Sequence, residues 1–176
     1  MTVQAREPEH LPTAYRPCVG ILLFNRSGAV WVGRRIDAPG DAEGAGTWWQ
    51  MPQGGIDDGE DPRSAALREL EEETGVRSAE IVAETSTWLT YDLPAHLIGV
   101  AWGGRYRGQK QKWFAARFLG DETEIVIDPP LGSAHKKEFD AWTWMPVGEL
   151  EAHVVPFKRA VYGAAITELR PVIAAF

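Results

Sequence analysis

The sequence contains very little cysteine, which limits both its chemistry and its means of stabilisation. Cys18 is the single cysteine among 176 residues, so an internal disulfide is excluded. It lies in the apolar segment PCVGILLF, where we expect a buried structural thiol rather than a nucleophile, since no histidine is near it in sequence. The four histidines lack the spacing of zinc ligands.

Long apolar runs are also missing. No window approaches the roughly 18 apolar residues of a membrane-spanning helix, and the N-terminal MTVQAREPEH has no apolar signal region. We therefore expect a soluble, cytoplasmic protein that does not bind membranes.

Positive charge is in deficit. The chain has 18 Lys and Arg residues against 25 Asp and Glu residues, a net charge of −7. This balance argues against non-specific binding of nucleic acid over the whole surface. The basic residues nevertheless occur in clusters, among them Arg34–Arg35, Lys136–Lys137 and Lys158–Arg159, so a local basic site is compatible with an acidic protein.

What the sequence does contain is the material of an ordinary globular domain. Hydrophobic residues make up 44% and charged residues 24%, and 176 residues suffice to bury a sizeable core. We expect a flexible N-terminal arm at residues 1–14, which is polar and holds two prolines, and a single α/β domain with a mixed sheet over residues 15–176. Residues 36–47 are rich in Gly and Ala and predict a mobile loop.

Local patterns place the elements of that domain. The apolar runs 19–24 and 29–35 flank turn residues and predict a hairpin. In the segment FDAWTWMP, alternation predicts a strand with Trp142 and Trp144 on one face and Phe139 on the other. Further strand segments are expected within 79–94, at 112–119 and at 124–127, and a last helix is expected from 156 to 169, with Pro171 ending it.

The stretch GGIDDGEDPRSAALRELEEETGV, residues 54–76, concentrates acidic residues. Asp61 suits an N-cap, Pro62 suits the first helical position and Gly75 suits the stop. These signals predict a helix over about 62–73.

Helical geometry divides the acidic residues of this segment. At about 100° per residue, Glu69, Glu72 and Glu73 share one face, whereas Glu71 points away from it. The apolar positions are expected to divide as well, with the small Ala65 and Ala66 leaving room beside the carboxylates and with Leu67 and Leu70 packing in the core.

Three carboxylates in one patch raise one another's pKa values unless a cation lies between them. Mg²⁺ is the obvious cation, because it prefers a few carboxylates together with water and substrate phosphates. Arg68 is placed to hold a carboxylate in orientation. The pair Gly54–Gly55 permits close backbone approach, so that a carbonyl oxygen there could also reach a metal.

The spacing within residues 54–76 matches a family motif. It follows G-x5-E-x7-R-E-L-x-E-E-x-G-V, and the chance of such a match at a given start is below one in about 10⁸ at average residue usage. The chain therefore resembles the Nudix hydrolases, with every defining position of the Nudix box present. The resemblance implies an α/β/α sandwich with a mixed central sheet, and hydrolysis of a nucleoside diphosphate linked to a further group.

The resemblance also implies roles for single residues. The metal ligands would be Gly54, through its carbonyl oxygen, and Glu69, Glu72, Glu73 and Glu138, holding two or three Mg²⁺ ions that Mn²⁺ can replace. Glu60 and Arg68 would stabilise the geometry between loop and helix. Metal ions lower the pKa of a bound water for in-line attack on phosphorus, and either Glu72 or Glu138 could take its proton.

Similarity outside the box points to a branch of the family. The segments YRPCVG, WQMPQGGI, WLTYDLP, GQKQKWF, EFDAWTW and VVPFKRAVY resemble a group that contains bacterial RNA pyrophosphohydrolases and the asymmetrically cleaving diadenosine tetraphosphate hydrolases of bacteria and plants. Two features depart from that group: Cys18 stands where asparagine is common, and loop 36–47 is longer than in several bacterial relatives. Both leave the choice of substrate open.

For the substrate, the resemblance implies contacts from basic and aromatic residues. Arg35, Lys112 and Lys158 would contact phosphates, and Tyr91 would donate a hydrogen bond to one. Arg16 and Phe157 are suited to stacking on a base.

The expected function is removal of pyrophosphate from the 5′-triphosphate end of RNA, together with hydrolysis of dinucleoside polyphosphates. One alternative is a dedicated asymmetrical diadenosine tetraphosphate hydrolase. A second is a non-catalytic nucleotide-binding module of the Nudix fold, which would be expected to lack some of the box glutamates.

Overall fold

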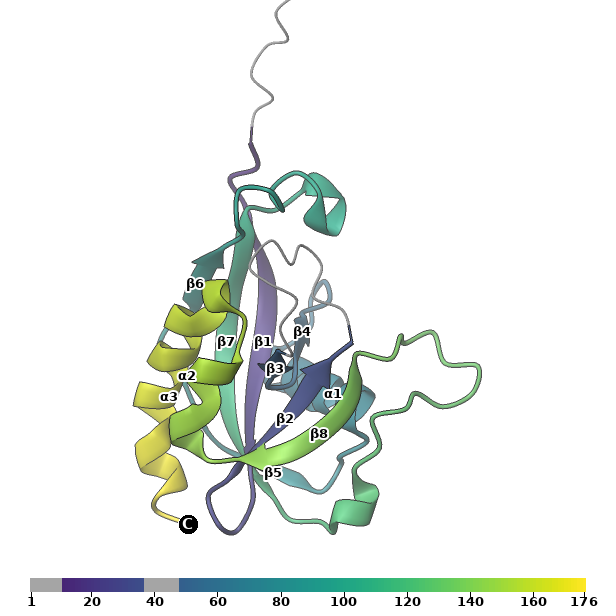
Figure 1. Ribbon diagram of the computed structural model, residues 1–176, viewed down its shortest axis with the longest axis vertical. Helices are drawn as coiled ribbons and strands as arrows, with labels where there is room; N and C mark the ends of the chain where they lie inside the picture. Colours follow the sequence, from purple (N-terminus) through teal and green to yellow (C-terminus); the bar gives the residue numbers. More distant parts are fainter. Residues whose placement is uncertain (1–10, 37–47) are drawn as a thin grey trace, which may run out of the picture.

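A mixed β-sheet with helices on both faces forms the protein, as the computed structural model shows (Figure 1). The structure describes residues 11–36 and 48–176. Most of the expected N-terminal arm and of the expected loop 36–47 therefore lies outside the described residues. Helices α2 (Leu150–His153) and α3 (Arg159–Ile173) cover one face of the sheet and helix α1 (Pro62–Thr74) covers the other, so the expected α/β/α sandwich is confirmed.

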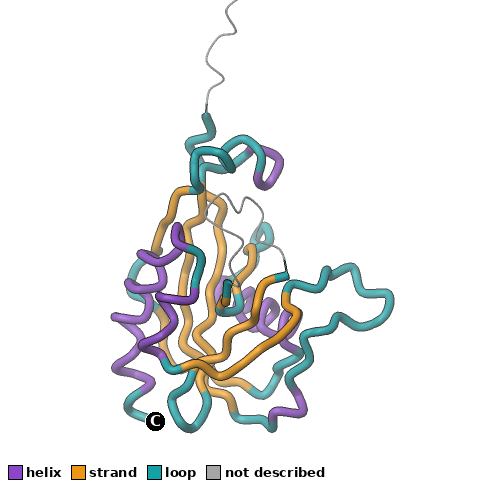
Figure 2. Tube along the Cα trace, viewed as in Figure 1, coloured by secondary structure: helices purple, strands orange, loops and turns teal. Residues whose placement is uncertain are grey.

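The centre of the sheet is a long parallel pair, β1 and β7, and every other pairing is antiparallel. The strand order is β3-β2-β1-β7-β5, while β4 also pairs with β1, β6 with β7 and β8 with β2 (Figure 2). The strands are β1 (Tyr15–Phe24), β2 (Val30–Arg35), β3 (Trp49–Gln50), β4 (Gln53–Gly55), β5 (Ala79–Glu84), β6 (Leu89–Asp92), β7 (Gly108–Phe118) and β8 (Phe139–Met145).

The hairpin between β1 and β2 forms where turn chemistry predicts it. The side-chain oxygen of Asn25 accepts hydrogen bonds from the backbone N–H groups of Ser27 and Ala29 at 3.0 and 3.1 Å. Gly28 takes a positive φ of 78°, a conformation that glycine adopts without steric cost. The expected strand pair is thereby confirmed.

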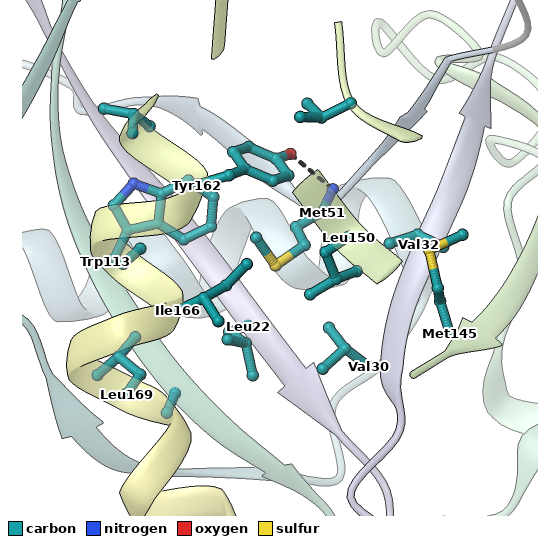
Figure 3. Packing of buried hydrophobic residues seen from close by; sticks show 14 of the residues in the cluster. Leu22, Val30, Val32, Met51, Trp113, Met145, Leu150, Tyr162, Ile166 and Leu169 are labelled. Carbon is teal, nitrogen blue, oxygen red and sulfur yellow. Dashed lines mark hydrogen bonds between the residues drawn. The ribbon is translucent and has the colours of Figure 1, made fainter. Parts of the chain in front are cut away.

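Two hydrophobic clusters hold the three layers together. Between the sheet and α3 (Arg159–Ile173), Trp113 packs edge-on to Tyr162 at 5.3 Å, among the aliphatic side chains of β1, β2 and α3 (Figure 3). The Tyr162 hydroxyl accepts a hydrogen bond of 2.9 Å from the backbone N–H of Met51, which leads from β3 into β4. This hydrogen bond from the segment between β3 and β4 to α3 helps to hold the two short strands in place.

The second cluster lies between the sheet and α1 (Pro62–Thr74), and it corrects one expectation about that helix. Ala65 and Ala66 are fully buried there together with Leu70, so they pack in the core rather than leave room beside the carboxylates. Leu67, expected in the core, is 41% exposed. Small side chains let the helix approach the sheet closely, and this selects Ala65 and Ala66 for its inner face.

Strand β8 also departs from strict alternation. Its register against β2 shifts between Arg34 and Arg35, which pair with Ala141 and Phe139, so Asp140 is an extra residue. Because a bulge turns the following side chains over, Phe139 and Trp142 lie on the same face, both against Trp31 at 5.4 and 6.5 Å. The expectation that they occupy opposite faces is wrong.

The expected strand at 124–127 does not form. Glu122–Glu124 is instead a short 3₁₀ helix, η2. The Glu124 carboxylate accepts hydrogen bonds from the backbone N–H groups of Arg77 and Ser78 at 2.7 and 2.9 Å. These bonds tie the segment to the chain that leaves α1 rather than to a strand.

The last helix is longer than expected. A 3₁₀ turn, η4 (Pro156–Lys158), leads into α3, which continues through Pro171 to Ile173. A proline so near the end removes a single hydrogen bond, and the buried Leu169 and Ile173 hold the last turn against the sheet. In the described part of the chain, no helix is long and apolar enough to cross a membrane.

Candidate active site

The acidic helix α1 starts and stops where its capping residues predict. The Asp61 carboxylate accepts a hydrogen bond of 3.1 Å from the backbone N–H of Ser64, and Gly75 closes the helix with a φ of 74°. Glu71 points away from the cleft and pairs with Arg77 at 2.8 Å on the surface. Glu69, Glu72 and Glu73 are thereby left together on the other side of the helix.

Arg68 is the centre of an ion-pair network behind these carboxylates. Its Nε and Nη2 donate to the two carboxylate oxygens of Glu60 at 2.7 and 2.8 Å, and its Nη2 also donates to the Gly55 carbonyl at 2.9 Å. Its Nη1 donates to Glu69 at 2.9 Å and lies 3.3 Å from Glu72. Hydrogen bonds from Arg68 lower the pKa of Glu60 to about 2. Glu60 and Arg68 thus join the loop, β4 and α1.

Glu69 and Glu73 are crowded against β4. A Cβ atom on Gly54 would lie 2.0 Å from the Glu69 carboxyl carbon, so the strand approaches α1 at this point only because residue 54 is glycine. Glu73 accepts a hydrogen bond of 3.1 Å from the backbone N–H of Gln53. Burial raises the pKa of Glu69, and burial with the nearby charges of Glu69 and Glu138 raises that of Glu73 well above its usual value.

Cations stand on the other side of the same cleft. Arg35, at the end of β2, lies 3.7 Å from Glu138, which immediately precedes β8. The side-chain oxygen of Gln50 accepts hydrogen bonds from both Arg35 and Lys158, at 3.3 and 2.9 Å. Burial, followed by the charge of Arg35, lowers the pKa of Lys158 to about 7. Sequence reasoning missed Gln50, although a polar residue inside the apolar WWQMP segment was a signal.

Aromatic side chains continue the cleft beyond these cations. Tyr91, in β6, is 7% exposed, and its ring lies 5.7 Å from that of Phe157 and 5.8 Å from the Lys158 ammonium. Burial raises the pKa of Tyr91, so its hydroxyl stays protonated and remains a donor. Arg16 lies against Gly55, where an added Cβ atom would come 2.5 Å from its Nη2.

These groups line a single cavity of about 480 Å³, within the usual range for a small-molecule site. Its acidic end is lined by Glu69, Glu72, Glu73 and Glu138, together with Gly54. Its walls also include Arg16, Arg35, Tyr91, Phe157 and Lys158, so most of the site residues expected from the sequence come together here.

Two further residues at the cleft had no signal in the sequence. His135 lies on the loop before β8, with its Nδ1 3.6 Å from the Glu72 carboxylate. Trp102 lies on the loop between β6 and β7.

Lys112 is the expected substrate residue that the structure does not bring to the cleft. In β7 it alternates with the fully buried Gln111 and Trp113, so its side chain leaves from the opposite face of the sheet. Its ammonium group donates to the Thr85 carbonyl and lies 3.9 Å from Glu84. Lys112 therefore lies outside the lining of the cleft, and the expected phosphate contact from it is not supported.

The donor set at the acidic end fits a hard divalent cation. Four carboxylates and the backbone of Gly54 border one cavity, and two of the carboxylates have raised pKa values, which a cation would reverse. Among residues 11–36 and 48–176, no three carboxylate, imidazole or thiolate groups are gathered closely enough to form a finished metal site. Arg68, which donates to Glu69 and approaches Glu72, holds these two carboxylates in their present positions.

Comparisons with known proteins agree with the fold and with the motif. The family described as NUDIX domain matches residues 14–164. An RNA pyrophosphohydrolase of Brucella ovis is 58% identical over 165 residues, which cover 93% of this chain and 91% of that protein.

Solved structures share the fold at low identity. A C. elegans Ap4A hydrolase in a binary complex superposes with a TM-score of 0.64 at 18% identity, covering 92% of this chain and 99% of that one. The E. coli dihydroneopterin triphosphate pyrophosphohydrolase gives a TM-score of 0.61, also at 18% identity, over 88% of this chain and 99% of that one.

Proposed function

The chain belongs to the Nudix hydrolase family, and from this premise we propose that it removes pyrophosphate from the 5′-triphosphate end of RNA. Hydrolases of this family generally use divalent metal ions. We further propose that two or three Mg²⁺ ions, replaceable by Mn²⁺, serve this chain in the cytoplasm. Dinucleoside polyphosphates are proposed as further substrates.

The observation that carries the proposal is the distribution of charge within the cleft. Carboxylates line one end, where Glu69 and Glu73 are held against β4, and the buried Lys158 lies beside Arg35 on the other side, joined to it by Gln50. A chain of phosphates needs both cations for its oxygens and a metal for the bond that breaks. The arrangement supports a polyphosphate substrate in an otherwise acidic protein.

The protein's own groups divide the work. Glu69, Glu72, Glu73 and Glu138, with the Gly54 carbonyl, would hold the metal. When bound, divalent ions offset charge on the phosphate oxygens and lower the pKa of a coordinated water. Glu60 acts on these ligands through Arg68 and keeps the carboxylates oriented.

On the substrate side, Arg35 and Lys158 contact phosphate oxygens and Tyr91 donates a hydrogen bond to one of them. Arg16 and Phe157 stack on a base. The proton of the attacking water passes to Glu72 or to Glu138. The pH dependence of kcat in E72Q and E138Q distinguishes these two candidate bases. Protonation of the base lowers kcat at acidic pH, so this fall persists only in the variant that keeps the base.

The proposal is tested by comparing substitutions of two neighbouring glutamates of α1. Glu72→Gln should lower kcat on triphosphorylated RNA by at least about 10³-fold, because it removes a metal ligand. Glu71→Gln is the matched control, since Glu71 faces solvent on the opposite side, and it should change kcat less than about twofold. Both variants should melt within a few degrees of the wild type. An active Glu72→Gln variant contradicts the proposed site.

The substrate class is decided by a panel assayed with Mg²⁺. Triphosphorylated RNA, diadenosine tetraphosphate, ADP-ribose and oxidised dGTP are compared by kcat/KM in the wild-type protein. We expect RNA to lead. A lead for diadenosine tetraphosphate would identify a dedicated asymmetrical hydrolase, and no turnover of any substrate would identify a binding module. A tenfold lead for ADP-ribose would contradict the assignment to this branch.

A further inference from the structure

The loop between β6 and β7 contains a strained aromatic residue. Trp102, in the short 3₁₀ helix η1 (Ala101–Gly104), has φ 52° and ψ 37°, which is the left-handed region. It is the non-glycine residue with positive φ in the described part of the chain. Gly103 and Gly104 follow it with φ of 66° and 73°. A bulky side chain in this conformation is a genuine outlier, and such outliers gather where a ligand is held.

The loop is wound so tightly that its shape is fixed by its glycines. A Cβ atom on Gly104 would lie 2.8 Å from the carbonyl oxygen of Gly99, which itself has a φ of 86°. The turn lies near the N-terminal ends of β1 and β7 (teal, at the top of Figure 1). Its backbone therefore carries the indole of Trp102 to one place on the cleft.

At that place Trp102 stacks with a cation. The Arg16 guanidinium lies 5.7 Å from the centre of the Trp102 ring, a cation–π distance. Gly55 lies against the same guanidinium, since a Cβ atom there would come 2.5 Å from Nη2. Tyr106 packs edge-on against the indole at 6.4 Å. Arg16 and Tyr106 thus both contact the Trp102 indole and support it at the cleft.

The part of the cleft next to this indole is apolar. Its lining comes from two separate segments, the connection between β6 and β7 and the turn before α3, with Leu93, Leu97, Ala101, Val155 and Phe157 in addition to Trp102. Phe157 lies 5.7 Å from the Tyr91 ring, and that ring lies 5.8 Å from the Lys158 ammonium, so this apolar part adjoins the cationic part of the cleft. An apolar, aromatic end next to a polyphosphate end suits the two parts of a nucleotide.

We propose that Trp102, stacked on Arg16, forms one wall of a nucleobase subsite that it shares with Phe157. The inference rests on the proposed function in taking the ligand to be a nucleotide. Stacking of a base on an aromatic side chain strengthens binding by about 5- to 150-fold, and every base has a face that can stack. Retention of the strained Trp102 backbone is explained by this contact.

The test compares Trp102→Gly with a matched tryptophan outside the cleft. Glycine adopts the left-handed conformation freely, so Trp102→Gly removes the indole while keeping the path of the loop. Trp88→Gly is the control, because Trp88 is 41% exposed and stacks on Lys110 away from the cavity lining. Melting temperatures of both variants check that the fold is intact.

Binding of two probes separates the base from the phosphates. ATP and inorganic tripolyphosphate are titrated in EDTA, which prevents metal-dependent turnover. Wild type and Trp88→Gly should bind ATP at least about fivefold more tightly than tripolyphosphate. In Trp102→Gly this ratio should fall below about two, with the affinity for tripolyphosphate unchanged.

Each other result counts against the inference. An unchanged ratio in Trp102→Gly shows that no base stacks there, and an equal loss for both probes shows that Trp102 acts on phosphates through Arg16. Equal affinity of the wild type for ATP and tripolyphosphate overturns the subsite as well. Because binding is measured without turnover, these outcomes are independent of whether RNA proves to be the substrate.

Discussion

Gly54→Ala should disable the active site without unfolding the protein. The new Cβ atom would lie 2.0 Å from the Glu69 carboxyl carbon and 2.2 Å from each of its oxygens, whereas ordinary contact begins at 3.4 Å. The carboxylate must therefore move by more than about 1 Å, and a displacement of this size costs about 10² in rate when it affects a catalytic group. Because Glu69 is the flexible partner, its side chain moves rather than the backbone of β4.

The assay measures kcat/KM on triphosphorylated RNA together with the melting temperature. Gly54→Ala should lose at least about 100-fold in kcat/KM and melt within a few degrees of the wild type. Gly148→Ala is the matched control, since nothing lies within 4 Å of its added Cβ atom, and it should keep full activity. Activity within threefold of the wild type in Gly54→Ala would refute the inference that Glu69 must lie against β4.

Three further predictions concern stability and the cleft. Tyr162→Phe leaves a buried backbone N–H without its acceptor and should lower the free energy of unfolding by about 1–3 kcal/mol, measured by urea titration. Tyr15→Phe, which loses an exposed hydrogen bond, should cost less than about 0.5 kcal/mol, and equal costs would contradict the first estimate. The pKa of Glu60 falls from 4.5 to about 2 on folding, so its contribution to stability is complete above pH 4.5 and is lost as pH falls toward 2. Glu60→Gln should remove that part of the loss of stability at acidic pH. Identical dependence of the free energy of unfolding on pH in Glu60→Gln and the wild type would contradict this contribution of Glu60. Lys158→Met should raise KM for triphosphorylated RNA at least about tenfold, because a charged donor is lost, while Lys112→Met should stay within about twofold. A larger rise in KM for Lys112→Met than for Lys158→Met would indicate that the phosphates bind on the face of the sheet opposite to the cleft.

The ends of the acidic helix and the directions of its glutamates could be predicted because the signals for them are local. Asp61, Pro62 and Gly75 act on the backbone within a few residues of themselves, and helical spacing alone separates Glu71 from Glu72. The interaction of Arg68 with Glu60 followed from the motif resemblance, and the structure places the pair at 2.7 Å. Features of this kind need no knowledge of the remaining fold.

The errors arose where tertiary contacts override a local pattern. Alternation in β8 predicted opposite faces for Phe139 and Trp142, but a bulge at Asp140 turns one of them over. Pro171 predicted a helix end, yet the buried Ile173 keeps the last turn in place. A bulge or a held helix end depends on neighbours that the local sequence does not contain.

Lys112 is a different kind of error, because the sequence held the information to avoid it. Its predicted role rests on a family resemblance, which transfers a residue type but not the direction of its side chain. Strand β7 begins at Gly108, and alternation along it puts Trp113 and Gln109 on one face and Lys112 on the other, while Gln109 lines the cleft. Side-chain direction in a strand is therefore a necessary check on roles assigned by resemblance.

The cationic side of the cleft shows why the substrate end could not be predicted from local signals. A single oxygen of Gln50 accepts from Arg35, 15 residues before it, and from Lys158, 108 residues after it. Two cations this close repel each other, and the charge of Arg35 contributes to the lowered pKa of Lys158. A bound phosphate would relieve that repulsion, just as a metal would relieve the repulsion among the carboxylates. Both ends of the cleft are thus electrostatically unfavourable until their ligands arrive, and a polyphosphate with its metal supplies the opposite charge to each.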